Sequence, residues 1–88
     1  MTNLDFSANF IPFLAKVELA GIPHTVTVSG NGMKIEFEDG SDIALNEATY
    51  GHDKGLLEGY MGKFRTFDDD VMGYLTAKQA FDILTLTA

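Results

Sequence analysis

The chain has 88 residues, no cysteine and 45% hydrophobic residues. This length indicates one small domain, residues 1–88, and the hydrophobic content is too high for a disordered chain. The absence of cysteine excludes a disulfide scaffold, a thiolate metal site and a cysteine nucleophile. The sequence shows no signal-peptide pattern and no run that approaches the ~20 apolar residues of a membrane span. We therefore expect a soluble, cytoplasmic protein.

The net charge of −7 is unevenly distributed. Up to Ile35 two acids balance two bases, whereas from Glu36 onward eleven acids face four bases, a difference equal to the whole net charge. An acidic chain without a basic cluster binds nucleic acid and anionic membranes poorly. The balance therefore favours a protein partner with a basic surface, or an acidic face that only solvates the protein.

The first predicted element is a helix over residues 10–20. Its apolar residues recur at spacings of three and four and form one stripe, made of Phe10, Phe13, Leu14 and Val17. Asn9 precedes the stripe and suits an N-cap, while Gly21 and Pro23 follow it and predict the end of the helix.

Residues 24–45 predict three antiparallel strands in a meander. Apolar residues alternate with polar ones along this stretch, which is the period of a half-buried strand, and they are Val26, Val28, Met33, Ile35, Phe37, Ile43 and Leu45. The pairs Asn31-Gly32 and Asp39-Gly40 tolerate the positive φ that tight hairpins require. One face of this sheet should be apolar and covered, and the other should be wet.

Residues 46–55 are polar and contain two glycines, so we predict a loop with Tyr50, His52 and Asp53 near its tip. Loops held by a rigid scaffold often carry functional residues.

Residues 56–67 fit either a helix or a strand. A helical stripe would consist of Leu57, Tyr60, Phe64 and Phe67. Gly59 and Gly62 would each cost a helix interior ~1 kcal/mol relative to Ala, so we favour a strand. Its hairpin partner would be residues 71–75, with the acidic residues 68–70 in the connection. The side chains sharing one face of the strand would be Leu56, Tyr60 and Phe64.

Thr76 followed by Gln79 is the pattern of a capping box and predicts a helix over residues 77–84. One face of this helix would carry Ala80, Ile83 and Leu84. The predicted fold class is therefore α+β, an antiparallel β-meander of three to five strands covered on one face by an N-terminal and a C-terminal helix.

Residues 64–84, FRTFDDDVMGYLTAKQAFDIL, resemble an EF-hand, the calcium-binding helix–loop–helix. The twelve-residue loop would begin at Asp68 and end at Gln79. The resemblance implies calcium ligation by Asp68 and Asp70 at the first and third positions. Two positions depart from the family, because Met72 at the fifth offers no oxygen and Gln79 replaces the bidentate glutamate. If the last third is helix–loop–helix, the sheet shrinks to the first three strands.

A second resemblance covers YGHDKGLLEG, residues 50–59, and DDVMGYLTAKQ, residues 69–79. These stretches are similar to the C-terminal half of small acidic accessory proteins encoded by phages and prophages. The resemblance implies an inhibitor of a host protein or defence complex that acts by direct binding in the host cytoplasm. It assigns a role to no particular residue.

We predict a small acidic protein-binding module rather than an enzyme, because no nucleophile–base pair is evident. The candidate partner-binding residues are Glu36, Glu38, Asp39, Asp42, Tyr50, Asp68, Asp69 and Asp70. We expect no cofactor, and a monomer or small homo-oligomer. A degenerate EF-hand-like calcium module is the alternative function, and a small enzyme ranks last.

Overall fold

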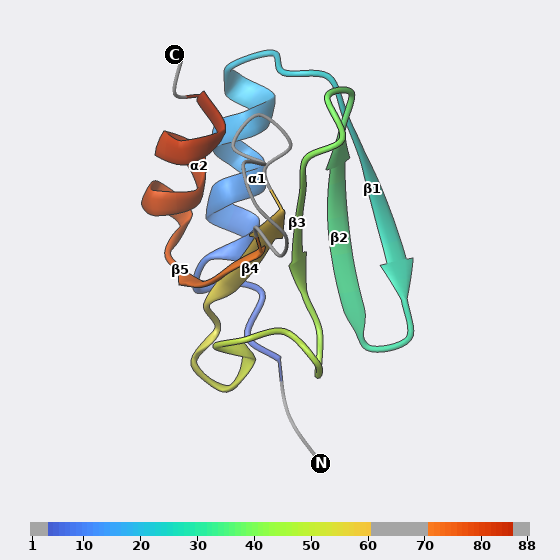
Figure 1. The fold of residues 1–88 in the computed structure, drawn as a ribbon, viewed down its shortest axis with the longest axis vertical. Coiled ribbons are helices and arrows are strands. Elements are labelled where there is room, and N and C mark those ends of the chain that lie inside the picture. Colours follow the sequence, from blue (N-terminus) through green and yellow to red (C-terminus); the bar gives the residue numbers. More distant parts are fainter. Residues whose placement is uncertain (1–3, 61–70, 86–88) are drawn as a thin grey trace.

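The computed structural model describes residues 4–60 and 71–85. The elements are α1 (Phe10–Leu19), β1 (His24–Ser29), β2 (Gly32–Phe37), β3 (Asp42–Leu45), η1 (His52–Lys54), β4 (Leu57–Tyr60), β5 (Val71–Leu75) and α2 (Ala77–Thr85). Each strand pairs antiparallel with the next one in the chain, which gives the sheet order β1-β2-β3-β4-β5. Figure 1 shows both helices on the same side of this sheet.

The predicted α+β meander is confirmed in its five-strand form. The alternative, in which the last third is helix–loop–helix and the sheet has three strands, is wrong for the described residues. Residues 57–60 and 71–75 are strands that pair with each other.

The core lies between the two helices and the sheet. It consists of Phe10, Phe13, Val17, Ile35, Phe37, Ile43, Leu45, Leu57, Leu75, Ala77, Ala80 and Leu84. Phe13 of α1 meets Phe37 of β2 edge to face, with ring centroids 6.3 Å apart. Lys16 of α1 reaches toward α2, where its Nζ lies 5.7 Å from the centre of the Phe81 ring. Burial of each large apolar side chain is worth about 1.5–3 kcal/mol, so this cluster holds the two layers together.

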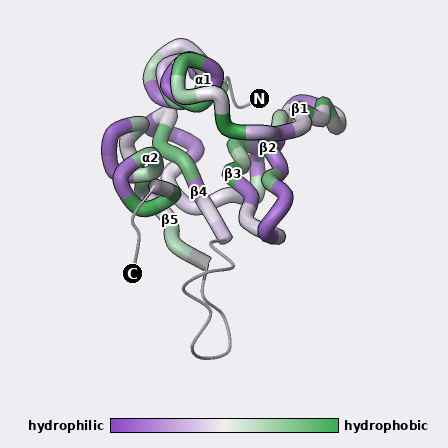
Figure 2. The backbone as a smooth tube through the Cα atoms, turned by 90° about the horizontal axis from the view of Figure 1, so that it is seen from above, coloured by the Kyte–Doolittle hydropathy of each residue, from purple (hydrophilic) through white to green (hydrophobic). Residues whose placement is uncertain are grey.

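The apolar residues of β1 lie outside this core. Val26 and Val28 point to the helix side of the sheet, opposite Ile35 and Met33, yet they are 37% and 69% exposed. Figure 2 shows β1 at the margin of the molecule, away from α2. The alternation predicted this strand correctly, but the expectation that the whole apolar face is covered is wrong at β1.

The two hairpin turns of the meander contain glycines with positive φ. Gly30 has φ 57° and Gly40 has φ 90°. Gly30 is the first central residue of the β1–β2 turn, where a positive φ is typical of type II′. The turn is therefore centred on Gly30 and Asn31, one residue before the predicted Asn31-Gly32 pair.

α1 ends as predicted, at a glycine in the left-handed region. Gly21 has φ 71°. Its N–H donates to the Glu18 carbonyl at 3.1 Å, and the Ile22 N–H donates to the Val17 carbonyl at 3.2 Å. This pair of bonds is a Schellman motif and satisfies two carbonyls that the helix leaves free.

The start of α1 differs from the prediction, because the Asn9 side chain makes no capping bond to its own helix. Its Nδ2 donates to the Gly55 carbonyl at 3.0 Å, and its Oδ1 accepts the Ala77 N–H at 2.9 Å. Asn9 therefore satisfies a donor in the first turn of α2 and fixes the loop before β4.

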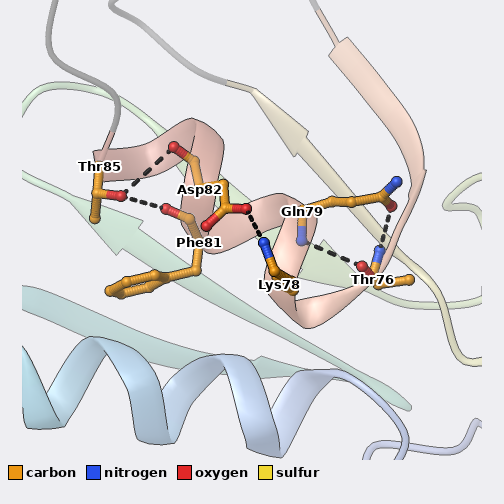
Figure 3. A network of polar contacts seen from close by, with 6 residues as sticks. All are labelled: Thr76, Lys78, Gln79, Phe81, Asp82 and Thr85. Atoms are coloured by element: carbon orange, nitrogen blue, oxygen red, sulfur yellow. Dashed lines mark hydrogen bonds and ion pairs between the residues drawn. The ribbon is translucent and has the colours of Figure 1, made fainter.

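α2 begins with the predicted capping box (Figure 3). The Thr76 N–H donates to Gln79 Oε1 at 3.0 Å, and the Gln79 N–H donates to Thr76 Oγ1 at 3.2 Å. Each bond satisfies a backbone donor that has no partner inside the helix. The capping box therefore fixes the point at which the chain leaves β5.

β4 is a strand, as we favoured, and its two faces differ in burial. Leu57 and Gly59 are buried on the helix side, whereas Glu58 and Tyr60 lie on the other face. The pairing with β5 shifts register between Leu57 and Gly59, and a glycine in a strand often marks such a bulge. Phe64 and Phe67 lie outside the described residues.

Candidate protein-binding surface

The side of the sheet opposite the helices carries mostly polar side chains. Alternation along β1 to β4 places eight residues there, namely Thr25, Thr27, Lys34, Glu36, Asp42, Ala44, Glu58 and Tyr60. We call this surface the open face, because neither of the helices in residues 4–60 and 71–85 covers it (Figure 1). Three carboxylates and one ammonium give it a net negative charge.

The acidic side chains of the open face are only partly compensated. Glu36 on β2 is paired in register with Asp42 on β3. Lys34 Nζ lies 3.5 Å from Glu36 Oε2, and Thr27 Oγ1 donates to Glu36 Oε1 at 3.5 Å. No ion pair within the described part of the chain involves Asp42 or Glu58. These two carboxylates are the excess negative charge of the surface.

The pKa of the Asp42 carboxyl is raised at this position. Burial raises the pKa of its carboxyl above the usual range, the Lys34 ammonium opposes the rise, and the Glu36 and Glu58 carboxylates add to it. A raised pKa means that the ionised form is disfavoured in the folded protein. A cation that docks beside Asp42 therefore relieves a repulsion already present in the free molecule.

Two tyrosines stack at the end of the sheet where Glu58 lies. The rings of Tyr50 and Tyr74 have centroids 6.3 Å apart and planes 17° from parallel. They come from different elements, the loop after β3 and strand β5, and are 62% and 60% exposed. The Tyr50 N–H donates to Glu58 Oε2 at 3.1 Å, which places a carboxylate beside the aromatic pair.

The backbone around the tyrosine pair has little freedom. Tyr74 has φ 58°, the only positive φ of a non-glycine residue in the described ranges. A side chain on Gly73 would strike the Cβ of Tyr50, and one on Gly51, whose φ is 87°, would crowd Tyr74. A bulky residue held in the left-handed region is strained, and such strain is concentrated at functional sites. The close approach and the strain together fix the two rings in one arrangement.

The loop that carries Tyr50 is held by its own polar side chains. Asn46 Oδ1 accepts the Ala48 N–H at 2.7 Å, and Thr49 Oγ1 donates to the Asn46 carbonyl at 2.9 Å. Thr49 is buried, and its own carbonyl accepts the His52 Nδ1–H at 2.8 Å. The predicted loop is therefore an ordered connection, with a short 3-10 turn at His52–Lys54.

The other predicted partner-binding residues are not gathered at the tyrosine pair. Glu38 and Asp39 are exposed in the β2–β3 turn, at the opposite end of the sheet, and Asp39 Oδ1 accepts the Ser41 N–H at 2.9 Å. They form part of the rim of a groove of about 380 Å³ with Ile22, Pro23, Phe37, Leu84 and Thr85. Asp68, Asp69 and Asp70 lie outside the described residues.

Sequence reasoning missed Tyr74 and Glu58. Both alternate with buried residues, since Glu58 stands between Leu57 and Gly59, and Tyr74 precedes Leu75. That alternation indicates that the side chains of Glu58 and Tyr74 point away from the core. It gave no indication that Tyr50, 24 positions before Tyr74, stacks on it, because the contact depends on how the loop closes.

The described half of the EF-hand window does not fit a calcium loop. Residues 71–75 form β5, and Thr76 and Gln79 spend their side-chain oxygens on each other's backbone N–H groups. Asp68 and Asp70 lie outside the described residues. In residues 4–60 and 71–85 no three histidine, aspartate or glutamate side chains come together to hold a metal ion. Calcium ligation by Asp68 and Asp70 therefore stays a prediction that the described residues do not test.

Both histidines bond to backbone carbonyls. His24 is half-buried, as its phase in β1 predicts, and its Nδ1–H donates to the Ile22 carbonyl at 2.7 Å. Its Nε2 lies 3.7 Å from Glu18 Oε2. The His52 Nδ1–H likewise donates to the Thr49 carbonyl. Their contacts are those of side chains that support local structure.

No protein-family model matches this chain, and no curated protein or solved structure matches it at a significant level. None of the helices in the described residues has both the length and the apolar character needed to cross a membrane.

Proposed function

We propose that this protein is a binding module for a partner protein with a basic surface, and that the partner docks an arginine against Tyr50 and Tyr74. The observation that carries the proposal is the exposed, stacked tyrosine pair beside the Glu58 carboxylate. Tyrosine and arginine are the residue types that most often dominate binding energy at protein interfaces.

The chemistry of the pair favours a guanidinium over an ammonium. An arginine plane stacks on aromatic faces and also pairs with a carboxylate through parallel N–H groups. Glu58 offers that carboxylate within the same site, since its Oε2 is already bonded to the Tyr50 N–H. A lysine satisfies only the charge, so arginine-bearing surfaces should bind more tightly than lysine-bearing ones.

The crowded carboxylates give the proposal a second support. Burial and the neighbouring acids raise the pKa of Asp42, so keeping the open face ionised costs the free protein stability. A basic partner offsets the part of that cost that comes from repulsion by Glu36 and Glu58. The same negative face should speed association through electrostatic steering.

We extend the proposal to an inhibitor of the phage type, acting without a catalytic step in the host cytoplasm. An acidic protein that covers a basic surface blocks the ligands that normally use that surface. The chain contains no cysteine, which agrees with a reducing compartment.

The test is the affinity of a fluorescent peptide with alternating arginine and glycine, measured by anisotropy against its lysine counterpart. The arginine peptide should bind more tightly, and its binding should weaken with salt as the ~10 Å Debye length at 0.1 M shortens. Tyr50→Ser together with Tyr74→Asn should weaken binding about tenfold, which corresponds to ~1.4 kcal/mol. Asparagine is chosen because it tolerates the left-handed backbone of Tyr74.

Leu19→Ser is the matched control, because Leu19 is 90% exposed on α1 and lies away from the open face. It should leave the affinity unchanged. The proposal would be overturned if the double variant, the control and the wild-type protein bound with equal affinity. The acidic surface would then only solvate the protein.

A further inference from the structure

The outer edge of β1 is an unprotected strand edge. Among the described residues β1 is the last strand on its side of the sheet, and its six residues, HTVTVS, contain no lysine, carboxylate or proline. Natural edge strands usually carry charges, prolines or bulges, because a free row of backbone N–H and C=O groups invites another strand. β1 has none of these devices.

The other edge strand, β5, also lacks charged residues and proline, but its backbone is irregular. β5 pairs with β4 through a shifted register, and Tyr74 within it leaves the extended conformation. Irregular backbone of this kind prevents a regular ladder from forming. The absence of protection at β1 is therefore a local property and not a general feature of this sheet.

The free backbone groups of β1 belong to the residues with exposed apolar side chains. A two-residue turn joins Ser29 to Gly32, so Ser29, Thr27 and Thr25 direct their backbone groups toward β2. The N–H and C=O groups of Val26 and Val28 consequently point outward. The side chains of these two valines are the ones that the helices leave exposed.

We infer that β1 pairs antiparallel with β1 of a second copy of this chain, and that the two five-stranded sheets join into one. Pairing about a two-fold axis at Thr27 sets Val26 of each copy opposite Val28 of the other. The strict alternation of the strand keeps both apolar sets on the helix side and both threonine sets on the open face. The same strand thus provides both halves of a self-complementary ladder.

Charge also favours a second copy over a basic strand from another protein. The β1 sequence contains no lysine, arginine or carboxylate, and the nearest charges of β2, Lys34 and Glu36, neutralise each other at 3.5 Å. The Glu18 carboxylate already lies 3.7 Å from His24 Nε2, so this edge attracts a cation less than the tyrosine end of the open face does. Each copy carries −7 overall, so the dimer should tighten as salt screens the repulsion.

The test is sedimentation equilibrium of the full chain up to millimolar concentration, with Val28→Lys as the variant and Leu19→Lys as the matched control. The wild-type protein and the control should form dimers whose population rises with salt, and Val28→Lys should remain monomeric at every concentration. Circular dichroism and thermal melting of Val28→Lys should match the wild type, because Val28 is largely exposed.

Hydrogen exchange of the wild-type protein tests the pairing without a variant. The Val26 and Val28 amides should become protected as concentration rises, while the protection of the amides of η1 should not change. A wild-type protein that stays monomeric would overturn the inference and leave a strand of another protein as the occupant of this edge. A dimer that Val28→Lys does not disrupt would overturn it as well. The opposite salt dependences separate this dimer from the binding of a basic partner.

Discussion

Asn9 joins three segments that are distant in the sequence. Its amide donates to Gly55 before β4 and accepts from Ala77 at the start of α2, while its own backbone leads into α1. The segment is half-buried, so water cannot replace both bonds without cost. A single polar side chain thus sets how the two helices meet the sheet.

We predict that Asn9→Ala lowers the free energy of unfolding by about 1–3 kcal/mol, because it removes the partner of a partly buried donor and of a partly buried acceptor. Urea denaturation measures this change. Ser7→Ala is the control, because Ser7 is exposed and bonds to its near neighbour Asp5, and its effect should stay below about 0.5 kcal/mol. Equal effects of the two substitutions would show that the bridge contributes nothing.

Asp42→Asn should stabilise the protein at neutral pH. Burial raises the pKa of Asp42 in the folded state above its unfolded value, so its stabilising contribution is present below the unfolded pKa and is lost as pH rises through the folded pKa. The advantage of the variant should therefore be largest near neutral pH and disappear in acid. The site is partly solvated, so the advantage should not exceed about 0.5 kcal/mol.

Urea denaturation as a function of pH provides the measurement for Asp42→Asn. Glu38→Gln removes one carboxylate from the exposed β2–β3 turn and serves as the charge-matched control. A constant difference between Asp42→Asn and the wild type from acid to neutral pH would contradict the assigned cause.

At the scale of elements, short sequence motifs predicted the helix ends that depend on neighbouring residues. The Thr76–Gln79 capping box and the glycine that ends α1 involve residues within five positions of each other, and both are confirmed. The role of Asn9 could not be predicted, because its partner Ala77 is 68 positions away. The alternation at Val26 and Val28 predicted a strand, but it contained no information on how far the helices would extend.

The sequence predicted part of the candidate site. The open face was expected to be wet and acidic because Glu36 and Asp42 alternate with apolar residues, and the structure places both there. Glu38 and Asp39 lie in the turn next to the Glu36–Asp42 pair, at the end of the sheet away from the tyrosine pair. The stacking of Tyr74 on Tyr50 arises only from loop closure and strained backbone, which no sequence pattern indicated.

Because β5 is a strand, we predict that calcium does not stabilise this protein. A ligand at a hundred times its Kd adds ~2.7 kcal/mol to a native state that alone binds it, and in a domain of this size each kcal/mol raises Tm by ~4–8 °C. Thermal melting in millimolar calcium should therefore show no shift, with millimolar magnesium as the ionic control. A rise of several degrees specific to calcium would restore the EF-hand interpretation.

At the scale of the whole molecule, the sheet divides two kinds of surface. The helices cover most of one face and bury its apolar side chains, while the opposite face holds carboxylates and ends in the tyrosine pair. Burial is the main cause of the raised pKa of Asp42, and the Glu36 and Glu58 carboxylates add a repulsion that binding of a cation offsets. The asymmetry between the two faces is the central feature of the proposed function.

The most direct test of that function is an NMR titration of the isotope-labelled wild-type protein with the arginine–glycine peptide. We predict the largest shifts at the amides of Tyr50, Glu58 and Tyr74, with smaller shifts along the open face and none at α1. Shifts spread evenly over all carboxylate-bearing residues, or centred on the groove beside Glu38 and Asp39, would contradict the account.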